Sequence, residues 1–367
     1  MGREMAKGKK KWVYILSLIV FAVYIFAAPR PISKETVLKP KWITSLDSNY
    51  PIGIGEDIPE KEDETLLPFI LGNRFGYVGE DGNFSINNTI NSYISMSAHR
   101  WAEYDAQPAL IKIMSPVNEA LFEIENPKGY PMFLEERVYI VGNEQNSVTA
   151  YGPSGNELWT YYFPAPLTCI DSKNGFLLAG TLDGEVVLLN SYGIPIFTPF
   201  EPGGSRLSVI LGCAISGDAS RLALITGIGD QRFLLMERTG DSYRIIYHEF
   251  LKDGFRRPVQ ISFIDHDSKV AFEREEGLGI YTIGSKNSVT LNLNGEITAI
   301  DDSGGEDYLF LISSLGPLEK RFIVIRYPGY IVNEVPYRSE TAFLARRYSR
   351  LYIGGDSSMA LFELEKK

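Results

Sequence analysis

The sequence predicts an all-β fold, a β-propeller of seven four-stranded blades, with one transmembrane helix before it. Three observations predict this arrangement. A basic N-terminal tail leads into an uncharged apolar run over residues 12–28. A strand–turn–strand pattern recurs five times between residues 168 and 354 at a mean spacing of about 44 residues, which is the period of propeller blades. Similar strands extend the pattern back to residue 75.

The composition indicates a folded protein with an acidic body. The 367 residues are 44% hydrophobic and 22% charged, which is enough apolar material for a large core. The formal net charge is −10, and the first eleven residues contribute +4, so the rest of the chain carries −14. A body with this charge repels phosphate backbones. We therefore predict no nucleic-acid partner.

Residues 1–11 and 12–28 are predicted to be a cytoplasmic basic tail and a transmembrane signal anchor. Positive charge keeps the N-terminal side in the cytoplasm, so the remainder would lie across the membrane. Cleavage as a signal peptide, giving a secreted protein, is the alternative. It needs a small residue where Ile25 or Phe26 stands. A buried core helix is a third interpretation, which the lysine cluster disfavours, and no cysteine near the run offers a lipid anchor.

Residues 29–66 are predicted to be an extracytoplasmic linker before the propeller at 67–367. The linker lacks the apolar periodicity needed to fold alone. Residues 37–43 differ because they have strand-like apolar content, and Pro40 is tolerated on an edge strand. The last recognisable strand, at 360–364, leaves the final blade one strand short. Residues 37–43 are therefore a candidate closing strand for that blade.

The blade count depends on a repeated pair of strands. Each copy has a short strand, a polar turn and a second apolar strand. The five copies are residues 168–180, 213–227, 261–272, 298–311 and 341–354. With earlier strands included, seven second strands lie near Tyr77, Tyr139, Leu177, Leu224, Phe272, Leu309 and Leu351. Six or eight blades are the alternatives. The interval between the first two second strands is the longest, which predicts an insertion at residues 88–128 and makes the count least secure there.

Residues 138–197 resemble the quinoprotein-type propeller repeat. In that repeat a glycine-rich hairpin and an apolar third strand precede a glycine with an aromatic residue four positions on. The two such pairs are Gly155 with Trp159 and Gly193 with Phe197. Residues 213–227 are more similar to the WD40-type strand, turn and strand. The resemblance covers roughly residues 66–365, and such motifs specify blade geometry rather than activity.

The resemblance implies a function only by analogy. The nearest analogue is the propeller component of outer-membrane β-barrel assembly machinery, an envelope scaffold, from which this chain departs because it lacks a lipid-anchor cysteine. Quinone-cofactor dehydrogenases share the repeat, but their adjacent-cysteine pair and acidic calcium site are not recognisable here. We therefore expect no cofactor.

No catalytic, cofactor-binding or metal-binding residues are predicted. Asp265, His266 and Asp267 look like a metal or acid–base cluster. The repeat alignment instead puts them on a strand-to-strand turn, where aspartates bond their own backbone. Acidic pairs such as Asp301 and Asp302 would serve glycoside hydrolysis only if two carboxylates faced each other about 5–10 Å apart. Nothing local indicates this, so we interpret them as solvated turns.

Cys169 and Cys213 are nearly one blade apart and take related positions on the first strands of neighbouring blades. In an oxidising compartment this invites a disulfide. Neighbouring inner strands splay apart, however, and a bridge needs Cα atoms within about 7 Å. Two buried free thiols are the preferred interpretation, with a disulfide and a metal or catalytic role as alternatives.

Basic and aromatic residues are the candidates for protein contacts, because arginine and aromatic side chains are enriched at interfaces and dominate binding energy. One group lies in the segment 94–104 and two are arginine pairs. The candidates are Arg100, Trp101, Tyr104, Arg256, Arg257, Arg346 and Arg347. The alternatives are solvated turns for the arginines and packing within an irregular first blade for the segment.

These predictions combine into a single-pass protein of the cytoplasmic (inner) membrane with its propeller on the periplasmic side. It would act as an interaction scaffold in a cell-envelope complex, with the membrane, through residues 12–28, and envelope proteins as partners. The alternative is a propeller enzyme or a small-ligand binding protein of the sugar-binding type, whose polar groups converge in the central channel from several blades.

Overall fold

The computed structural model describes residues 36–47, 52–53, 66–196, 202, 207–252, 254–302 and 307–366. The chain divides into two compact units, Met1–Lys39 with Glu363–Lys367, and Pro40–Phe362. In the smaller unit, Lys39 pairs with Glu365 at 3.2 Å, and both side chains are exposed. The predicted anchor at 12–28 lies outside the described residues. Within the described part, no helix has the length and hydropathy needed to cross a bilayer.

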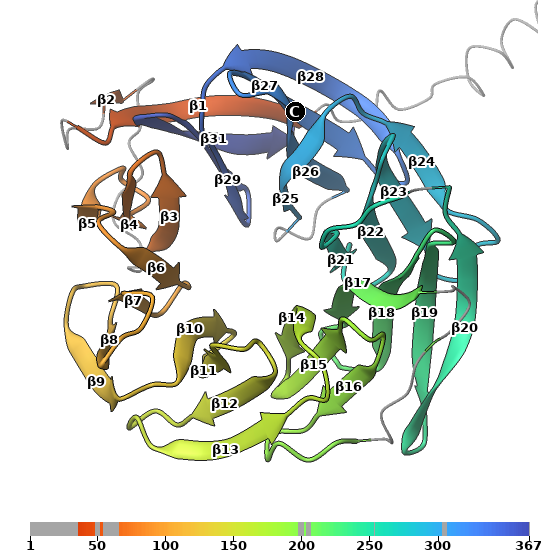
Figure 1. Cartoon of the computed structure of the whole chain (residues 1–367). Helices are drawn as coiled ribbons and strands as arrows, with labels where there is room; N and C mark the ends of the chain where they lie inside the picture. Colours follow the sequence, from red (N-terminus) through yellow and green to blue (C-terminus); the bar gives the residue numbers. More distant parts are fainter. Residues whose placement is uncertain are drawn as a thin grey trace, which may run out of the picture. The chain divides into compact units, whose positions relative to one another are not determined.

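The larger unit is built from strands alone in its described part, and these form eight sheets arranged around a ring (Figure 1). The prediction of seven blades is therefore wrong, because the propeller has eight. The five strand–turn–strand segments between residues 168 and 354 are confirmed as the antiparallel first and second strands of the last five sheets.

The first four sheets follow one another along the chain, with the first strand of each nearest the centre of the ring (Figure 1). Their strands are β3 (Leu67–Leu71), β4 (Arg74–Val78) and β5 (Phe84–Thr89); β6 (Tyr93–Met96), β7 (Trp101–Tyr104), β8 (Leu110–Met114) and β9 (Ala120–Glu125); β10 (Gly129–Leu134), β11 (Arg137–Gly142), β12 (Ser147–Tyr151) and β13 (Glu157–Tyr162); and β14 (Leu167–Lys173), β15 (Phe176–Thr181) and β16 (Val186–Leu189).

The next three sheets have four strands each and keep the same order. Their strands are β17 (Leu207–Ile215), β18 (Arg221–Ile228), β19 (Arg232–Thr239) and β20 (Ser242–Phe250); β21 (Ile261–Ile264), β22 (Lys269–Arg274), β23 (Gly277–Thr282) and β24 (Val289–Asn292); and β25 (Glu296–Asp301), β26 (Tyr308–Gly316), β27 (Glu319–Arg326) and β28 (Tyr330–Arg338).

The eighth sheet combines strands from both ends of the propeller sequence. Its order is β2 (Ile52–Gly53), β1 (Thr36–Ser45), β31 (Ser358–Lys366), β30 (Arg350–Gly355) and β29 (Ala342–Arg347). Trp42 of β1 is fully buried and packs edge-on against Tyr352 of β30, with ring centroids 6.1 Å apart. Its indole N–H donates to the carbonyl of Glu80, after β4 of the first sheet, at 2.8 Å. Trp42 therefore ties the eighth blade to the first.

The blade that the sequence did not reveal is β6–β9, which occupies the predicted insertion at residues 88–128. The turn before β9 has the same two backbone hydrogen bonds as the turn before β13. Asn118 stands there with φ 67°, at the position that Gly155 takes with φ 77° in the next blade. Phe122 follows Asn118 by four residues, as Trp159 follows Gly155. Asparagine tolerates the left-handed conformation, so the repeat is present without its glycine.

The glycine–aromatic pairs of the repeat join neighbouring blades. The indole of Trp159 lies against Gly193 of the next blade, where an added Cβ would come within 2.5 Å of the ring. Its N–H donates to the carbonyl of Ser191 at 3.0 Å. Phe122 lies in the same way against Gly155, at 2.7 Å from such a Cβ. Both glycines have positive φ, so the backbone conformation and the close approach each require glycine.

The apolar core forms layers between neighbouring sheets. Between the β17–β20 and β21–β24 blades, the buried rings of Phe233 and Phe272 stack with centroids 4.6 Å apart. Between the first and eighth blades, Trp42 joins Phe69, Tyr352 and their neighbours in one cluster. Because each sheet buries both faces against adjacent sheets, every blade depends on two others for its packing.

Replacing Trp42 with alanine is expected to lower the free energy of unfolding by about 3–5 kcal/mol, as for other buried aromatic residues. The loss arises from the cavity and from the broken hydrogen bond to Glu80. Urea denaturation followed by circular dichroism would measure it. Ile43→Ala is the matched control, because Ile43 is next in the same strand and 40% exposed. Equal losses for the two variants would contradict a role of Trp42 in closing the ring.

Candidate functional site

Five carboxylates lie in the first strands or in the turns that follow them, and they accept backbone N–H groups from the adjacent blade. We call them the interblade carboxylates. The acceptors and their backbone donors are as follows: Glu135 accepts from Asn174 at 2.9 Å, Asp171 from Ile215 at 2.9 Å, Asp267 from Gly217 at 2.7 Å, Asp302 from Asp265 at 2.5 Å, and Asp301 from Arg346 at 2.6 Å. Together they link six consecutive blades at the same level of the ring.

Burial changes the acid–base behaviour of two of these groups. It raises the pKa of Asp171 above its ordinary value, although the bonds from Ile215 and Ser172 oppose the shift. Burial likewise raises the pKa of Asp302, which also accepts the hydroxyl of Tyr327 at 2.6 Å. Both oxygens of Asp171 accept backbone N–H groups, and Oδ2 of Asp302 accepts from both Asp265 and Tyr327. The structure therefore uses these acids to join blades.

Asp265, His266 and Asp267 form a turn between β21 and β22, as predicted, and all three residues have positive φ. Its bonds extend further than the sequence indicated. The Asp265 carboxylate accepts the hydroxyl of Ser268 at 2.7 Å and pairs with Lys269, whereas Asp267 bonds to another blade. His266 is exposed at the tip. Among the described residues, no three histidine, cysteine or acidic side chains gather as a metal site would require.

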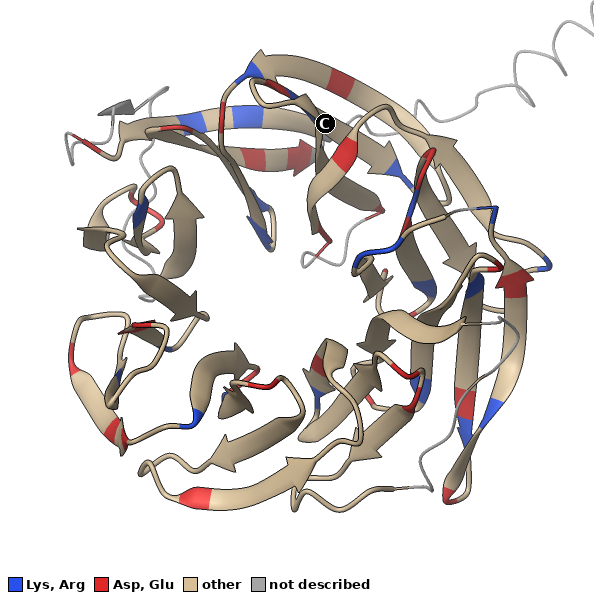
Figure 2. Ribbon diagram, in the orientation of Figure 1, with Lys and Arg blue, Asp and Glu red and all other residues tan. Residues whose placement is uncertain are grey.

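One signal for the interblade carboxylates is present in the sequence. Asp171 and Asp301 stand at equivalent points of the repeat, and both accept an N–H from the adjacent blade. Asp265 stands at the same point, but its carboxylate bonds within its own turn. Figure 2 shows charged positions at many turns and strand ends, and also within β1, β31 and β28. An acidic residue at this aligned position therefore indicates contact with the adjacent blade in two of the three repeats.

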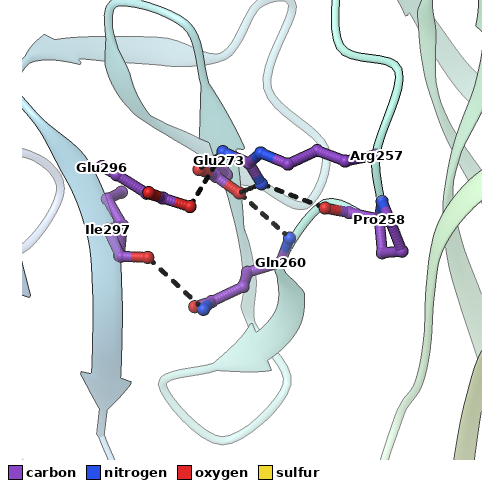
Figure 3. Close-up of polar contacts among 6 residues, drawn as sticks. All are labelled: Arg257, Pro258, Gln260, Glu273, Glu296 and Ile297. Carbon is purple, nitrogen blue, oxygen red and sulfur yellow. Dashed lines mark hydrogen bonds and ion pairs between the residues drawn. The ribbon is translucent and has the colours of Figure 1, made fainter.

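A second polar cluster surrounds Arg257, one of the predicted contact residues (Figure 3). Its guanidinium makes two hydrogen bonds to Glu273 of β22, at 2.7 and 3.0 Å. The Glu273 side chain is only 3% exposed, whereas that of Arg257 is 43% exposed. The guanidinium also lies 3.6 Å from Glu296 on β25. The hydrogen bond to Glu273 raises the pKa of Arg257, and the cluster joins the β21–β24 blade to the β25–β28 blade.

The other predicted arginines have separate surroundings. Arg346 is buried at the end of β29, where its Nε donates to the carbonyl of Tyr348 at 3.0 Å and its guanidinium lies 5.2 Å from the ring of Phe310. Arg347 is half-buried and Arg256 is exposed. In the second pair Arg347 is therefore more exposed than Arg346, whereas Arg256 and Arg257 are both exposed.

The segment 94–104 lies in the β6–β9 blade. Trp101 is 7% exposed, packs against Phe75 with centroids 5.1 Å apart, and donates its indole N–H to the carbonyl of Ser115 at 3.0 Å. It is a core residue of its blade. Arg100 bonds to the carbonyl of Glu136, and Tyr104 is half-buried in a stack with the exposed Tyr93.

Two cavities lie along the innermost strands β14, β17 and β21. They measure about 380 and 470 Å³ and share Ile170, Cys213 and Ile261 in their walls. Cys169 lines the first, and the polar groups of the second include Asp171, which is already bonded to Ile215. Lys173 and Asp267 also line the second cavity, and Asp267 is bonded to Gly217 of the adjacent blade.

Residues 5–367 match the family described as beta-propeller protein. The chain belongs to the beta-propeller family. A Treponema pallidum (strain Nichols) protein described as "Uncharacterized protein" is 24% identical to this propeller over 367 residues, which cover 98% of this chain and 95% of that protein.

Two solved structures are similar to this propeller. The crystal structure of BamB from Moraxella catarrhalis has a TM-score of 0.59 and 12% identity, and the match covers 89% of this chain and all of that one. The computationally designed Ika8 protein has a TM-score of 0.56 and 13% identity, with 83% and 98% coverage. At these identities the two likenesses show a shared fold.

Removing the guanidinium by Arg257→Ala is expected to cost about 2–3 kcal/mol of unfolding free energy, because it leaves the Glu273 carboxylate buried without its cation. The expected loss is below that of a fully buried pair, since solvent screens part of the Arg257 charge. Arg256→Ala, at the exposed neighbour, should change stability by less than about 0.5 kcal/mol. Urea denaturation of both variants measures the difference, and indistinguishable midpoints would count against a stabilising role of this pair.

A further prediction concerns the pH dependence of the turn at Asp218, between β17 and β18. Hydrogen bonds from Ser220, followed by one from Ser216, lower the pKa of Asp218 to about 2. A lowered pKa contributes stability above the unfolded value near 4 and loses it as pH falls toward 2. The stability gap between the protein and Asp218→Asn should therefore be constant from pH 7 to 5 and narrow below pH 4. Urea midpoints across this range would test it, and a gap independent of pH would refute it.

Proposed function

We propose that this propeller is a protein-interaction scaffold of a cell-envelope complex, held at the outer side of the cytoplasmic membrane by residues 12–28. The support for the membrane part is the basic tail followed by the uncharged apolar run. The support for the scaffold part is the beta-propeller family and a feature of the outer surface.

That feature is the apolar surface of β28, the outermost strand of its sheet. Four large hydrophobic side chains of this nine-residue strand are exposed: Tyr330 by 61%, Ile331 by 43%, Val332 by 55% and Val335 by 45%. Among the described residues, no strand pairs with the outer edge of β28. Exposed apolar side chains beside unpaired backbone groups favour binding of another polypeptide.

The candidate contact residues fit this proposal to different degrees. Arg256, Arg347 and Tyr104 are exposed or half-buried and can contact a partner. Trp101 and Arg346 are buried within the propeller. We also propose that residues 138–197 are repeats of the quinoprotein type and residues 213–227 a repeat of the WD40 type. Its support is the pair Trp159 and Gly193, whose contact joins two blades.

A small-ligand receptor is the second candidate, and the two cavities beside β14, β17 and β21 favour it. A sugar-type ligand in this wall would be held by a few polar groups among apolar ones. An enzyme needs an acid or base free to act, and the described carboxylates at this level, Asp171 and Asp267, are bonded across blades. An enzyme therefore ranks below both the scaffold and the receptor.

A photo-crosslinking residue at Val332 is expected to give a discrete adduct with one envelope protein in intact cells that produce the full chain. A crosslinker at Leu158 of β13, another outermost strand, is the matched control, because Leu158 is 48% exposed. The adduct should appear at Val332 and not at Leu158. Equal or absent adducts at both positions, or recovery of the chain from the cytosol, would reject the proposed function.

A further inference from the structure

Cys169 on β14 and Cys213 on β17 occupy neighbouring innermost strands of two blades, and both are free thiols. Two contacts hold these strands together on either side of the cysteines. The hydroxyl of Thr168 donates to the carbonyl of Ile210. At the other end, the Asp171 carboxylate accepts the N–H of Ile215 at 2.9 Å. The strands are therefore fixed side by side along the stretch that contains both thiols.

Both cysteines lie between the two blades, where they line the same cavity and pack in the same apolar cluster. The Cys213 side chain is 7% exposed, and Cys169 packs against the same apolar cluster. Burial, followed by the interaction with the Cys169 thiol, raises the pKa of Cys213. Gly180 on β15 makes room for this arrangement, because an added Cβ would lie 2.7 Å from the Cys169 sulfur and 2.4 Å from Ile210.

Small reagents have a route to the pair. Both cysteines line the cavity of about 380 Å³ on the innermost strands. Cys169 is half-buried, whereas Cys213 is buried and its sulfur lies 3.9 Å from the carbonyl of Leu178. Attack on a disulfide needs an accessible thiolate, so Cys169 is the thiol that reacts first and Cys213 the one that follows.

We propose that Cys169 and Cys213 form a modification site, a dithiol that closes into a disulfide between two blades by exchange with a small disulfide such as oxidised glutathione. The Cys169 thiolate attacks one sulfur of the donor, forming a mixed disulfide and releasing one donor thiolate. The Cys213 thiolate then attacks the Cys169 sulfur, forming the new bond and releasing the second donor thiolate. Two protons leave the cysteines, and two electrons pass to the donor disulfide. This inference is independent of the proposed scaffold role.

The test uses the purified full chain, reduced and then equilibrated in glutathione buffers of increasing oxidation. Alkylation followed by mass measurement should show both thiols disappearing together, with the loss of two hydrogen atoms and no bound glutathione. A peptide containing both residues should be recovered without reductant. The urea midpoint should rise on oxidation and return when dithiothreitol is added, because the bond constrains the unfolded chain.

Cys169→Ala and Cys213→Ala are the matched controls, and each leaves one thiol. Neither variant should gain stability in the oxidised buffer, and Cys213→Ala should carry one glutathione on Cys169. The proposal is overturned if both thiols of the folded protein stay open to alkylation in the oxidised buffer. It is equally overturned if each cysteine binds its own glutathione, or if the thiols are withheld by a metal that a chelator removes.

Discussion

Closure of the ring by Trp42 is the constraint on which the rest of the propeller depends. Each sheet buries both faces against its neighbours, so an open ring would expose two apolar faces, those now covered at the junction of the first and eighth blades. The strand that carries Trp42 comes from the beginning of the chain, while β29–β31 come from the end. The blades between them are therefore held by a contact that forms only when both ends are in place.

The interblade carboxylates extend this constraint to the polar side chains. Burying a carboxylate is costly unless hydrogen bonds replace water. A backbone N–H of the next blade supplies one at Asp171, and a backbone N–H of the preceding blade supplies one at Asp302. A carboxylate bonded in this way fixes the spacing of two sheets near the ends of their first strands. The contact of Trp159 with Gly193 fixes the spacing of two sheets at their outer strands. The acids that resembled catalytic groups therefore hold the blades together. The outer surfaces are then the better candidates for the functional site.

The β-propeller architecture and the five strand–turn–strand segments could be predicted from local patterns, because alternating apolar residues and polar turns are encoded within about ten residues. The number of blades could not. The predicted number of blades was wrong because one repeat lacks its glycine. Asn118, which tolerates positive φ, stands at that position. The hydrogen-bond partners of the candidate residues could not be predicted, because they lie far away in the sequence. Asp267 bonds to Gly217, fifty residues earlier, and an aspartate in a turn has the same local sequence whether or not it reaches another blade.

The outer strands differ in ways that bear on function. β20 and β28 are both nine residues long and outermost in their sheets. In β20 only two consecutive apolar residues are exposed, Ile245 by 42% and Ile246 by 39%, and its exposed Phe250 lies 5.6 Å from the guanidinium of Arg232. In β28 three exposed apolar residues, Tyr330 to Val332, are consecutive. A consecutive run presents apolar surface on both faces of the strand, which no internal packing requires, so a partner polypeptide is the most economical explanation for it.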